Sequence, residues 1–255
     1  MPKPTSPKPS HLVAMGGGGF SMDTPPESAP LDNYVLRLSG KKRPKICFIP
    51  TASGDSDTYI ARFLAAFPKS RAHASVLHLF RRDATNPHEL LLAQDIVYVG
   101  GGNTANLLEI WRRHGIDATL GKLWKRGNIV LAGISAGMNC WFDACSTDSF
   151  GPLAPLTGGL GIVPGAACPH FDGEERRRSS LVKFIASGKL PPTHAADDFA
   201  AFHFTRQGPR AVLHDCIKSR PTAGCYFLEK QGRSNSPSSV VIESLPTRLL
   251  DPAGR

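Results

Sequence analysis

Short apolar runs alternate with amphipathic segments of helical length through the first half of the chain. The apolar runs predict buried strands, and apolar residues every three or four positions predict helices between them. We expect strands at 11–15, 45–50, 75–80, 95–99 and 128–132, helices at 58–67, 104–114 and 120–126, and a helical turn at 33–39. Strands separated by helices are typical of βαβ units. The sequence therefore predicts an α/β fold with a mainly parallel sheet and helices on both faces.

The pattern changes after about residue 150, where shorter apolar runs lie between Gly and Pro turns. We expect shorter strands at 158–163, 200–204, 211–213 and 224–228. No shift in composition separates this part from the rest, so we predict one domain over residues 11–245. Residues 1–10 are expected to be a disordered leader, and residues 246–255 a C-terminal tail. The leader is rich in proline and lacks the apolar segment of a secretory signal.

Composition and charge narrow the classes of function. The chain is 41% apolar and 20% charged, which suits a globular protein with a core. Its apolar runs fall short of the roughly 18 residues that span a bilayer, so we expect no membrane association and a cytoplasmic location. The net charge of +9 comes from short, separate clusters. Aromatic residues do not interleave with them as in a stacking platform, and we predict no nucleic-acid partner.

The six cysteines predict neither a disulfide framework nor a metal site. No pair has CxxC spacing, and no His/Cys cluster has the spacing of zinc ligands. In a chain of this size without a signal segment, reduced thiols are the better interpretation.

The strongest chemical signal is the segment N-I-V-L-A-G-I-S-A-G-M at 128–138. Here an apolar strand meets a G-x-S-x-G turn, which in hydrolases exposes a nucleophilic serine between a strand and a helix. We therefore predict Ser135 as the nucleophile. The amide of Ala136 is one expected oxyanion donor. The second is expected from Gly101 and Gly102, because they follow another strand and glycine permits close backbone approach.

A serine nucleophile needs a base and a carboxylate that orients the base. His170 leaves an apolar stretch and enters a polar loop, which suits a base, although spacing does not exclude His194 or His203. Asp148 lies thirteen residues after the serine, beyond the expected helix, while Asp197 and Asp198 precede an apolar run. From the residues, all three carboxylates stay open.

Three segments together resemble peptidase E and its relatives, which include the cyanophycinases. They are G-G-G-N-T-A-N-L-L from 100, G-I-S-A-G-M-N from 133 and P-H-F-D-G-E from 169. The resemblance implies a fold like the class I glutamine amidotransferases, which is flavodoxin-like, and no cofactor or metal. It implies Ser135 as nucleophile and His170 as base. Asp148 is the nearest match for the third member, with Asp198 and Asp197 as alternatives.

The resemblance also carries expectations about substrate. Peptidase E removes an N-terminal aspartate from Asp-X dipeptides, so a short peptide is the expected partner, bound by Arg176 and Asn103. The chain is expected to be a monomer or a homodimer. The loop after His170 is short for this family, which leaves two alternatives open. One is a cyanophycinase-like or broader peptidase, and the other is an inactive relative that binds peptides. Serine at the turn, where an amidotransferase has cysteine, disfavours amidotransferase activity.

Overall fold

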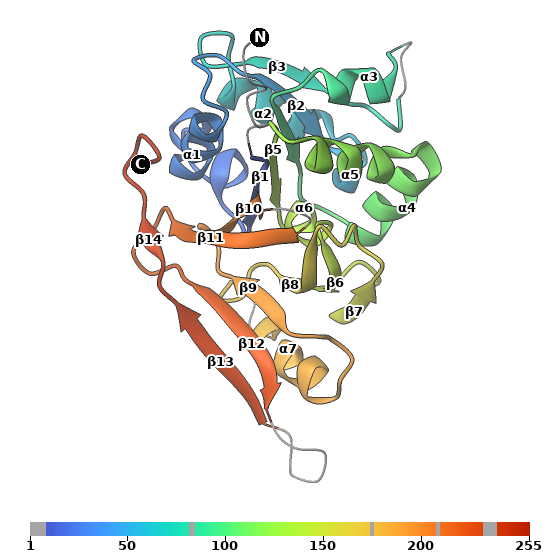
Figure 1. Ribbon diagram of the computed structural model, residues 1–255, viewed down its shortest axis with the longest axis vertical. Coiled ribbons are helices and arrows are strands. Elements are labelled where there is room, and N and C mark those ends of the chain that lie inside the picture. Colours follow the sequence, from blue (N-terminus) through green and yellow to red (C-terminus); the bar gives the residue numbers. More distant parts are fainter. Residues whose placement is uncertain (1–8, 82–84, 174–175, 208–209, 232–238) are drawn as a thin grey trace, which may run out of the picture.

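The computed structural model describes residues 9–81, 85–173, 176–207, 210–231 and 239–255, and their strands form two sheets (Figure 1). The strands are β1 (His11–Met15), β2 (Lys45–Ile49), β3 (His73–Val76), β4 (Ile96–Val99), β5 (Val130–Ile134), β6 (Phe142–Thr147), β7 (Ala154–Thr157), β8 (Val163–Cys168), β9 (Thr193–Ala196), β10 (Ala200–Gln207), β11 (Arg210–Lys218), β12 (Cys225–Gln231), β13 (Ser239–Leu245) and β14 (Arg248–Leu249). The helices are α1 (Pro30–Leu38), α2 (Asp57–Ala66), α3 (Pro87–Leu92), α4 (Thr104–His114), α5 (Ile116–Arg126), α6 (Ala136–Asn139) and α7 (Arg177–Ala186).

The first sheet has the order β14-β11-β10-β1-β5-β4-β2-β3. Its strands from β1 to β3 pair in parallel, and β10 and β11 extend it with antiparallel pairs. Helices cover both faces. On one face, α1 and α2 contribute residues such as Val35 and Phe63 to the core, while on the other α4 and α5 contribute Trp111 and Leu123. The amphipathic patterns thus indicated an α/β fold with helices on both sides, and this is the fold observed.

The second sheet has the order β13-β12-β9-β8-β6-β7 and was not anticipated as a separate layer. Its strands β6, β8 and β9 are parallel, whereas β7, β12 and β13 add antiparallel pairs. The strand expected at 158–163 is wrong. That segment connects β7 to β8, and its residues Gly158 and Gly161 have φ of 83° and 61°, outside the extended region. The strand was predicted there because glycine and apolar residues alternate in this segment, as they can in a strand.

The ends of the expected domain need correction. Residues 246–255 are not a tail, because β14 pairs with β11 and Leu250 is 5% exposed within the core beside α1. The side-chain amide of Asn33 donates to the carbonyl of Pro252 at 2.7 Å, which fixes this segment further. Ser10 is buried, and its hydroxyl donates to the carbonyl of Trp124 at 2.9 Å. Residues 1–8 of the expected leader lie outside the described residues.

The cysteines lie inside the fold. All six are buried thiols. Burial raises the pKa of Cys47 and of Cys145 to about 12, and raises that of Cys140 well above its usual value. Such thiols stay protonated at neutral pH and are poor nucleophiles.

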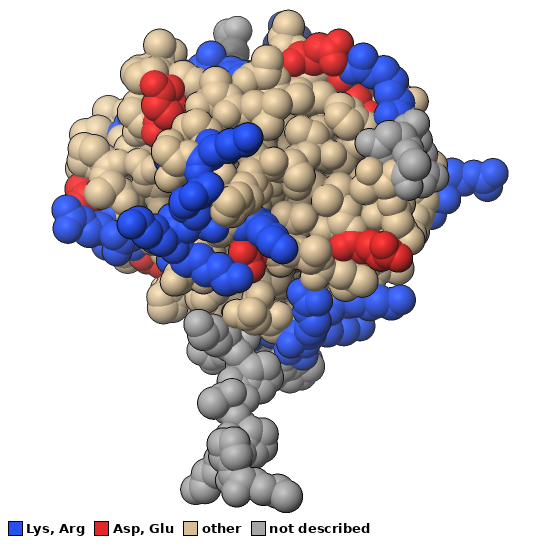
Figure 2. Space-filling model, turned by 90° about the horizontal axis from the view of Figure 1, so that it is seen from above, with Lys and Arg blue, Asp and Glu red and all other residues tan. Residues whose placement is uncertain are grey.

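Two surface properties accompany this fold. In the described part of the chain, no helix is long and apolar enough to cross a membrane. Figure 2 shows the face that lies at the top of Figure 1. On that face Lys and Arg lie in several groups with uncharged surface between them and acidic side chains near some of them.

His194 on β9 lies between the two sheets in a cluster of aromatic rings. Its ring centroid is 5.0–5.5 Å from those of Phe142, Phe202, Phe204 and Phe227. Its Nδ1 is buried and has no hydrogen-bond partner among the described residues. Burial lowers the pKa of His194 to about 4. The neutral ring therefore belongs to the folded state.

We expect His194→Phe to reduce the loss of stability in acid. The pKa of His194 is lower in the folded state than its unfolded value of about 6.5. The contribution of the neutral ring to the free energy of unfolding is therefore complete above pH 6.5 and is lost as the pH falls towards 4. The loss is about 1.4 kcal/mol per pH unit. Urea unfolding should show that the free energy of unfolding falls by about 2–3 kcal/mol less in the variant than in wild type between pH 7.0 and pH 4.5. An unchanged loss, equal to that of the exposed control His73→Gln, would contradict this.

Candidate active site

Three predicted residues converge where strand ends of the two sheets meet. Ser135 directly follows β5 of the first sheet, and His170 follows β8 of the second. Asp198 lies in the turn between β9 of the second sheet and β10 of the first. Ser135 and His170 line one open pocket of about 370 Å³. This volume falls in the range of roughly 300–1,000 Å³ that is usual for small-molecule sites.

Ser135 has the backbone of a nucleophile elbow. Its φ of 57° and ψ of −111° are unusual for a residue with a side chain, and strain of this kind is commonly kept at functional sites. The turn is also tight, because a Cβ on Gly133 would lie 2.1 Å from the carbonyl oxygen of Gly137. The amide of Ser135 donates to the carbonyl of Met15 at 3.0 Å, which ties the turn to β1. The G-x-S-x-G segment thus forms the strand–turn–helix unit that its sequence predicted.

His170 is oriented by Asp198. The Nδ1 of His170 is 2.6 Å from the Oδ1 of Asp198, and both side chains are about one-fifth exposed. Since an ionised carboxylate only accepts hydrogen bonds, Nδ1 carries the proton and Nε2 is left as the acceptor. His170 also has a positive φ of 52°. The described residues include no hydrogen bond between His170 and Ser135, and such contacts often close only when substrate binds.

The glycine run after β1 makes room for this pair. A Cβ on Gly17 would lie 2.0 Å from Oδ1 of Asp198 and 3.1 Å from Nδ1 of His170. The carbonyl of Gly17 also accepts a hydrogen bond from the amide of Phe199 at 3.2 Å, next to the aspartate. This turn needs glycine because its backbone closely approaches the histidine and its carboxylate.

The carboxylate beside His170 is therefore not the first-ranked Asp148. Asp148 lines the same pocket as Ser135 and His170, but it is exposed and makes no side-chain hydrogen bond within the described residues. Asp197 points elsewhere. Its Oδ2 accepts hydrogen bonds from the amide of Gly224 at 2.8 Å and the hydroxyl of Tyr226 at 3.2 Å. Burial, followed by the charge of Asp172, raises its pKa to about 6.

The backbone amides expected to stabilise the oxyanion differ in their hydrogen bonds and in their position relative to the pocket. The amide of Gly101 donates to the hydroxyl of Tyr59 at 3.2 Å, so that amide is already engaged. Gly102 lines the pocket with Ser135. Ala136 begins α6 directly after the nucleophile. Of the two glycines, Gly102 is thus the better candidate. The contact with Tyr59 was not predicted from the sequence, because no local motif marks this tyrosine.

The pocket is lined by Arg177 rather than by Arg176. Arg176 is exposed and precedes the first residue of α7. Arg177, the first residue of the helix, is only 3% exposed. The next residue, Arg178, lies over the ring of Phe171, with its guanidinium carbon 5.4 Å from the centroid. Three consecutive arginines therefore have three different environments.

Asn103 lines the pocket and also holds the loop that carries Asp148. Its Oδ1 accepts a hydrogen bond from the amide of Asn106 at 2.9 Å, which caps α4. Its Nδ2 donates to the carbonyl of Ser149 at 2.9 Å. The hydroxyl of Ser149 in turn accepts from the amide of Ala105 at 3.2 Å. Asn103 was predicted to bind substrate, and its side chain is engaged in positioning this loop.

The rival histidines lie away from the pocket. His194 is in the aromatic cluster described above. His203 is 1% exposed, and its two ring nitrogens are 3.0 Å from Nδ1 of His11 and 2.8 Å from the hydroxyl of Tyr34. Burial lowers its pKa to about 3. The described residues contain no group of three or more His, Cys, Asp or Glu side chains arranged to hold a metal ion.

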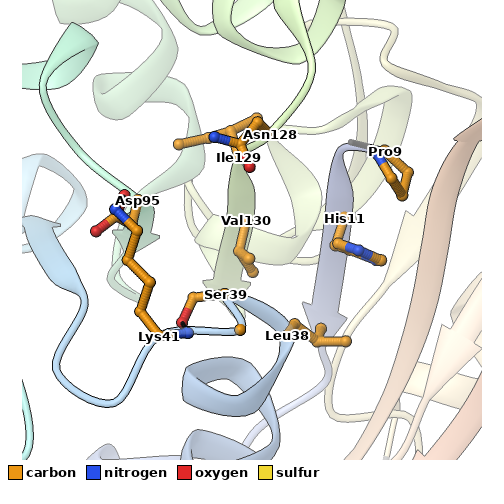
Figure 3. A pocket seen from close by; sticks show the side chains of 10 residues that line it. Pro9, His11, Leu38, Ser39, Lys41, Asp95, Asn128, Ile129 and Val130 are labelled. Atoms are coloured by element: carbon orange, nitrogen blue, oxygen red, sulfur yellow. Dashed lines mark hydrogen bonds and ion pairs between the residues drawn. The ribbon is translucent and has the colours of Figure 1, made fainter. Parts of the chain in front are cut away.

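A different pocket lies at the opposite, amino ends of β1 and β5 (Figure 3). Lys41 and Asp95 lie on one side of it, and Pro9 and His11 on the other. Lys41 forms an ion pair with Asp95 at 2.7 Å. The cavity measures about 100 Å³, and none of the predicted site residues lines it. The pocket that contains Ser135 is therefore the candidate active site.

Comparison with known proteins assigns the family. The profile described as Peptidase family S51 matches residues 12–212. The chain belongs to peptidase family S51. It is 45% identical over 216 residues to the uncharacterized peptidase YgaJ of Bacillus subtilis, covering 85% of this chain and 90% of that protein. It is 33% identical over 220 residues to peptidase E of Streptomyces coelicolor, covering 82% and 84%.

Solved structures agree on the fold. The crystal structure of a peptidase from an acI-B1 actinobacterium has a TM-score of 0.64 to this chain at 17% identity, covering 94% of this chain and 97% of that one. The resemblance to peptidase E is thus confirmed at the level of the family. The chain is a peptidase of family S51, and the matched span contains all the candidate site residues.

Proposed function

We propose that this S51 peptidase is a serine peptidase with Ser135 as nucleophile, His170 as general base and acid, and Asp198 as the carboxylate that orients the histidine. The observation that carries the proposal is the 2.6 Å contact between His170 and Asp198, in the pocket that the strained Ser135 turn also lines. A base held in one tautomer, in the same pocket as a partly exposed serine, is the arrangement that nucleophilic catalysis requires.

In the proposed reaction, Nε2 of His170 takes the proton of the Ser135 hydroxyl as Oγ bonds to the scissile carbonyl carbon. The carbonyl oxygen becomes an oxyanion, which the amides of Ala136 and Gly102 would stabilise. The carbon–nitrogen bond then breaks, and His170 gives the proton to the departing amine. Water, deprotonated by the same histidine, hydrolyses the acyl-enzyme and frees Ser135. Asp198 stabilises the imidazolium in both halves of the reaction.

We further propose that the acyl-side residue of the substrate is aspartate and that Arg177 binds its side-chain carboxylate. Arg177 lines the pocket and is nearly buried, so its charge is weakly screened by water. A guanidinium group also matches the planar geometry of a carboxylate. The resemblance to peptidase E supports this preference, with the position shifted by one residue from Arg176.

The test compares Asp-p-nitroanilide with Asn-, Leu- and Ala-p-nitroanilide. Wild type is expected to prefer Asp over the uncharged, nearly isosteric Asn by about 10- to 100-fold in kcat/KM, the range of a hydrogen bond between charged groups. Arg177→Met should remove the preference. The neighbouring exposed variant Arg176→Met is the matched control and should keep it.

Other outcomes of this comparison distinguish the alternatives. Cleavage of the neutral substrates at equal rates would keep the serine mechanism and reject the acidic preference. Loss of the preference in Arg176→Met alone would return the role to Arg176. Hydrolysis of β-aspartyl-arginine in preference to every α-linked substrate would favour the cyanophycinase-like alternative.

A further inference from the structure

We propose that a second cavity, at the edge of the first sheet away from Ser135, binds a small soluble molecule that carries phosphate groups. The cavity measures about 360 Å³ and is formed by α1, by the loop that leads into β2 and by the loop that leads into β3. The basic side chains that line it are Arg37, Lys41, Lys42 and Arg71. No acidic residue belongs to the lining within the described part of the chain. The inference does not depend on the proposed serine mechanism.

The position of the cavity separates it from the nucleophile. Lys41 and Lys42 come before β2, and Arg71 comes before β3, whereas Ser135 directly follows β5. The strands β2, β3 and β5 all belong to the parallel part of the first sheet. Parallel strands have their amino ends at one edge of a sheet and their carboxyl ends at the other. A ligand in this cavity would therefore leave the substrate pocket free.

Arg71 forms a fixed wall of the cavity. Its guanidinium group donates to the carbonyl oxygens of Glu27 at 2.7 Å and Ala66 at 2.5 Å, and to Oδ1 of Asn33. The side chain is half-buried, and burial lowers its pKa, while the charges of Asp32 and Glu27 act in the opposite direction. No ion pair joins Arg71 to either carboxylate in the described structure. An anion bound beside Arg71 would favour its charged form.

Two further cations at this cavity have no counter-ion. Arg37 and Lys42 are exposed, and neither forms an ion pair with a described residue. Lys41 differs from them, because it pairs with Asp95 at 2.7 Å and also borders the smaller pocket of Figure 3. The positive charges of Arg37, Lys42 and Arg71 around one cavity repel one another, and a bound anion would attract all three.

The side chains around the cavity specify the chemistry of the ligand. Lysine and arginine side chains donate hydrogen bonds and cannot accept them, so the ligand must present several acceptor oxygens. A phosphate monoester carries about −1.5 to −2 charges near pH 7 and three acceptor oxygens, which is more than a single carboxylate offers. The planar guanidinium group of arginine also matches the geometry of phosphate. The donors of this cavity therefore favour phosphate groups.

The shape of the site favours a free molecule over a lipid surface. The cavity volume lies within the range of roughly 300–1,000 Å³ that is usual for small-molecule sites. Arg71 is half-buried, so a ligand must enter the cavity to reach its guanidinium group. The headgroups of a flat bilayer would meet the exposed Arg37 and Lys42 instead. The ligand class is accordingly a soluble phosphate ester or a short polyphosphate.

The experiment measures the binding of inorganic pyrophosphate by calorimetry at an ionic strength of about 0.15 M, where surface charges are screened beyond about 8 Å. Wild type should bind one pyrophosphate per chain, at least about tenfold more tightly than citrate, whose charges are on carboxylates. Arg37→Gln/Lys42→Gln should weaken the binding of pyrophosphate by about tenfold or more, because it removes two charge-assisted contacts. Arg71 is left unchanged, since its hydrogen bonds hold the surrounding backbone.

The matched control is Arg43→Gln/Lys69→Gln. It removes the same charge from exposed residues of the same two loops, whose side chains do not line the cavity. Its affinity for pyrophosphate should stay within about twofold of wild type. Equal loss of affinity in the two double variants would show attraction by overall charge and overturn the proposal. Equal affinity of wild type for citrate would reject a phosphate ligand.

Further arms distinguish this cavity from the substrate pocket and from a lipid site. Arg177→Met and Ser135→Ala, which alter the substrate pocket, should bind pyrophosphate as wild type does, so failure of the serine mechanism would leave this result unaffected. Loss of binding in Arg177→Met would place the anion in the substrate pocket. Wild type should not float with vesicles of phosphatidylcholine and phosphatidic acid. Flotation that Arg37→Gln/Lys42→Gln abolishes, without binding of pyrophosphate, would assign the site to a lipid surface and overturn the proposal.

Discussion

Ser135→Ala is expected to lower kcat by a factor on the order of 10⁴ or more, because the acyl-enzyme has no other nucleophile to form on. Cys140, the thiol nearest to Ser135 in the sequence, cannot substitute for it. Cys140 is buried, its Sγ lies 3.3 Å from the carbonyl of Gly137, and burial raises its pKa well above the usual value. The measurement is hydrolysis of Asp-p-nitroanilide under saturating substrate, with mass spectrometry of the fluorophosphonate adduct.

The matched control is Ser187→Ala, which removes an exposed hydroxyl just after α7. It should leave both turnover and labelling unchanged. Circular dichroism should show that Ser135→Ala remains folded, since alanine keeps the Cβ, adds no strain at the positive φ and removes no core contact. Turnover by Ser135→Ala within tenfold of wild type would end the serine mechanism.

Asp198→Asn is expected to reduce kcat by about 10²–10⁴-fold, the range that a positioned acid–base group contributes. The side-chain amide of asparagine can donate to Nδ1 of His170. The ring proton would then lie on Nε2, which could no longer accept the proton of the serine hydroxyl. The backbone conformation of the turn should be unchanged, because the backbone amide of residue 198 donates to Asp172 and this bond does not involve the substituted side chain.

Asp148→Asn is the comparison that makes this result specific. Asp198→Asn should slow fluorophosphonate labelling of Ser135 together with peptide hydrolysis, since both need the activated hydroxyl. Asp148→Asn changes an exposed carboxylate of the same pocket that does not contact His170, so it should leave the rate of labelling unchanged. If Asp198→Asn kept near-normal labelling while Asp148→Asn lost it, Asp148 rather than Asp198 would be the third member of the catalytic group.

The features that sequence predicted best are local ones. The elbow at Ser135 and the helix at 104–114 depend on residues within a few positions of one another, and both were found as expected. The partner of His170 depends instead on β8 packing beside β9 and on the turn that returns to the first sheet, 28 positions away. The resemblance to peptidase E favoured Asp148, whereas tertiary packing brought Asp198 to the histidine.

The prediction of the arginine in the pocket was wrong by one residue, since Arg177 rather than Arg176 lines it. Consecutive residues of a helix point about 100° apart, so an error of one position changes which side chain enters a pocket. The start of α7 at Arg177 decides this, and no cap signal marked that start in the sequence. The second sheet was missed for a related reason. Its strands are short, and their pairing joins segments such as β9 and β12 whose register is set by tertiary contacts.

The turn at Asp198 leaves one sheet and enters the other, so the proposed catalytic group is shared between two separately hydrogen-bonded layers. The hydroxyl belongs to one layer, the imidazole to the other, and the carboxylate to the turn that connects them. Proton transfer tolerates little change in distance. A small shift of one sheet relative to the other would therefore separate Ser135, His170 and Asp198, even if each sheet kept its own hydrogen bonds. The aromatic packing around His194 connects the two sheets, and it would therefore help to keep these three groups in register.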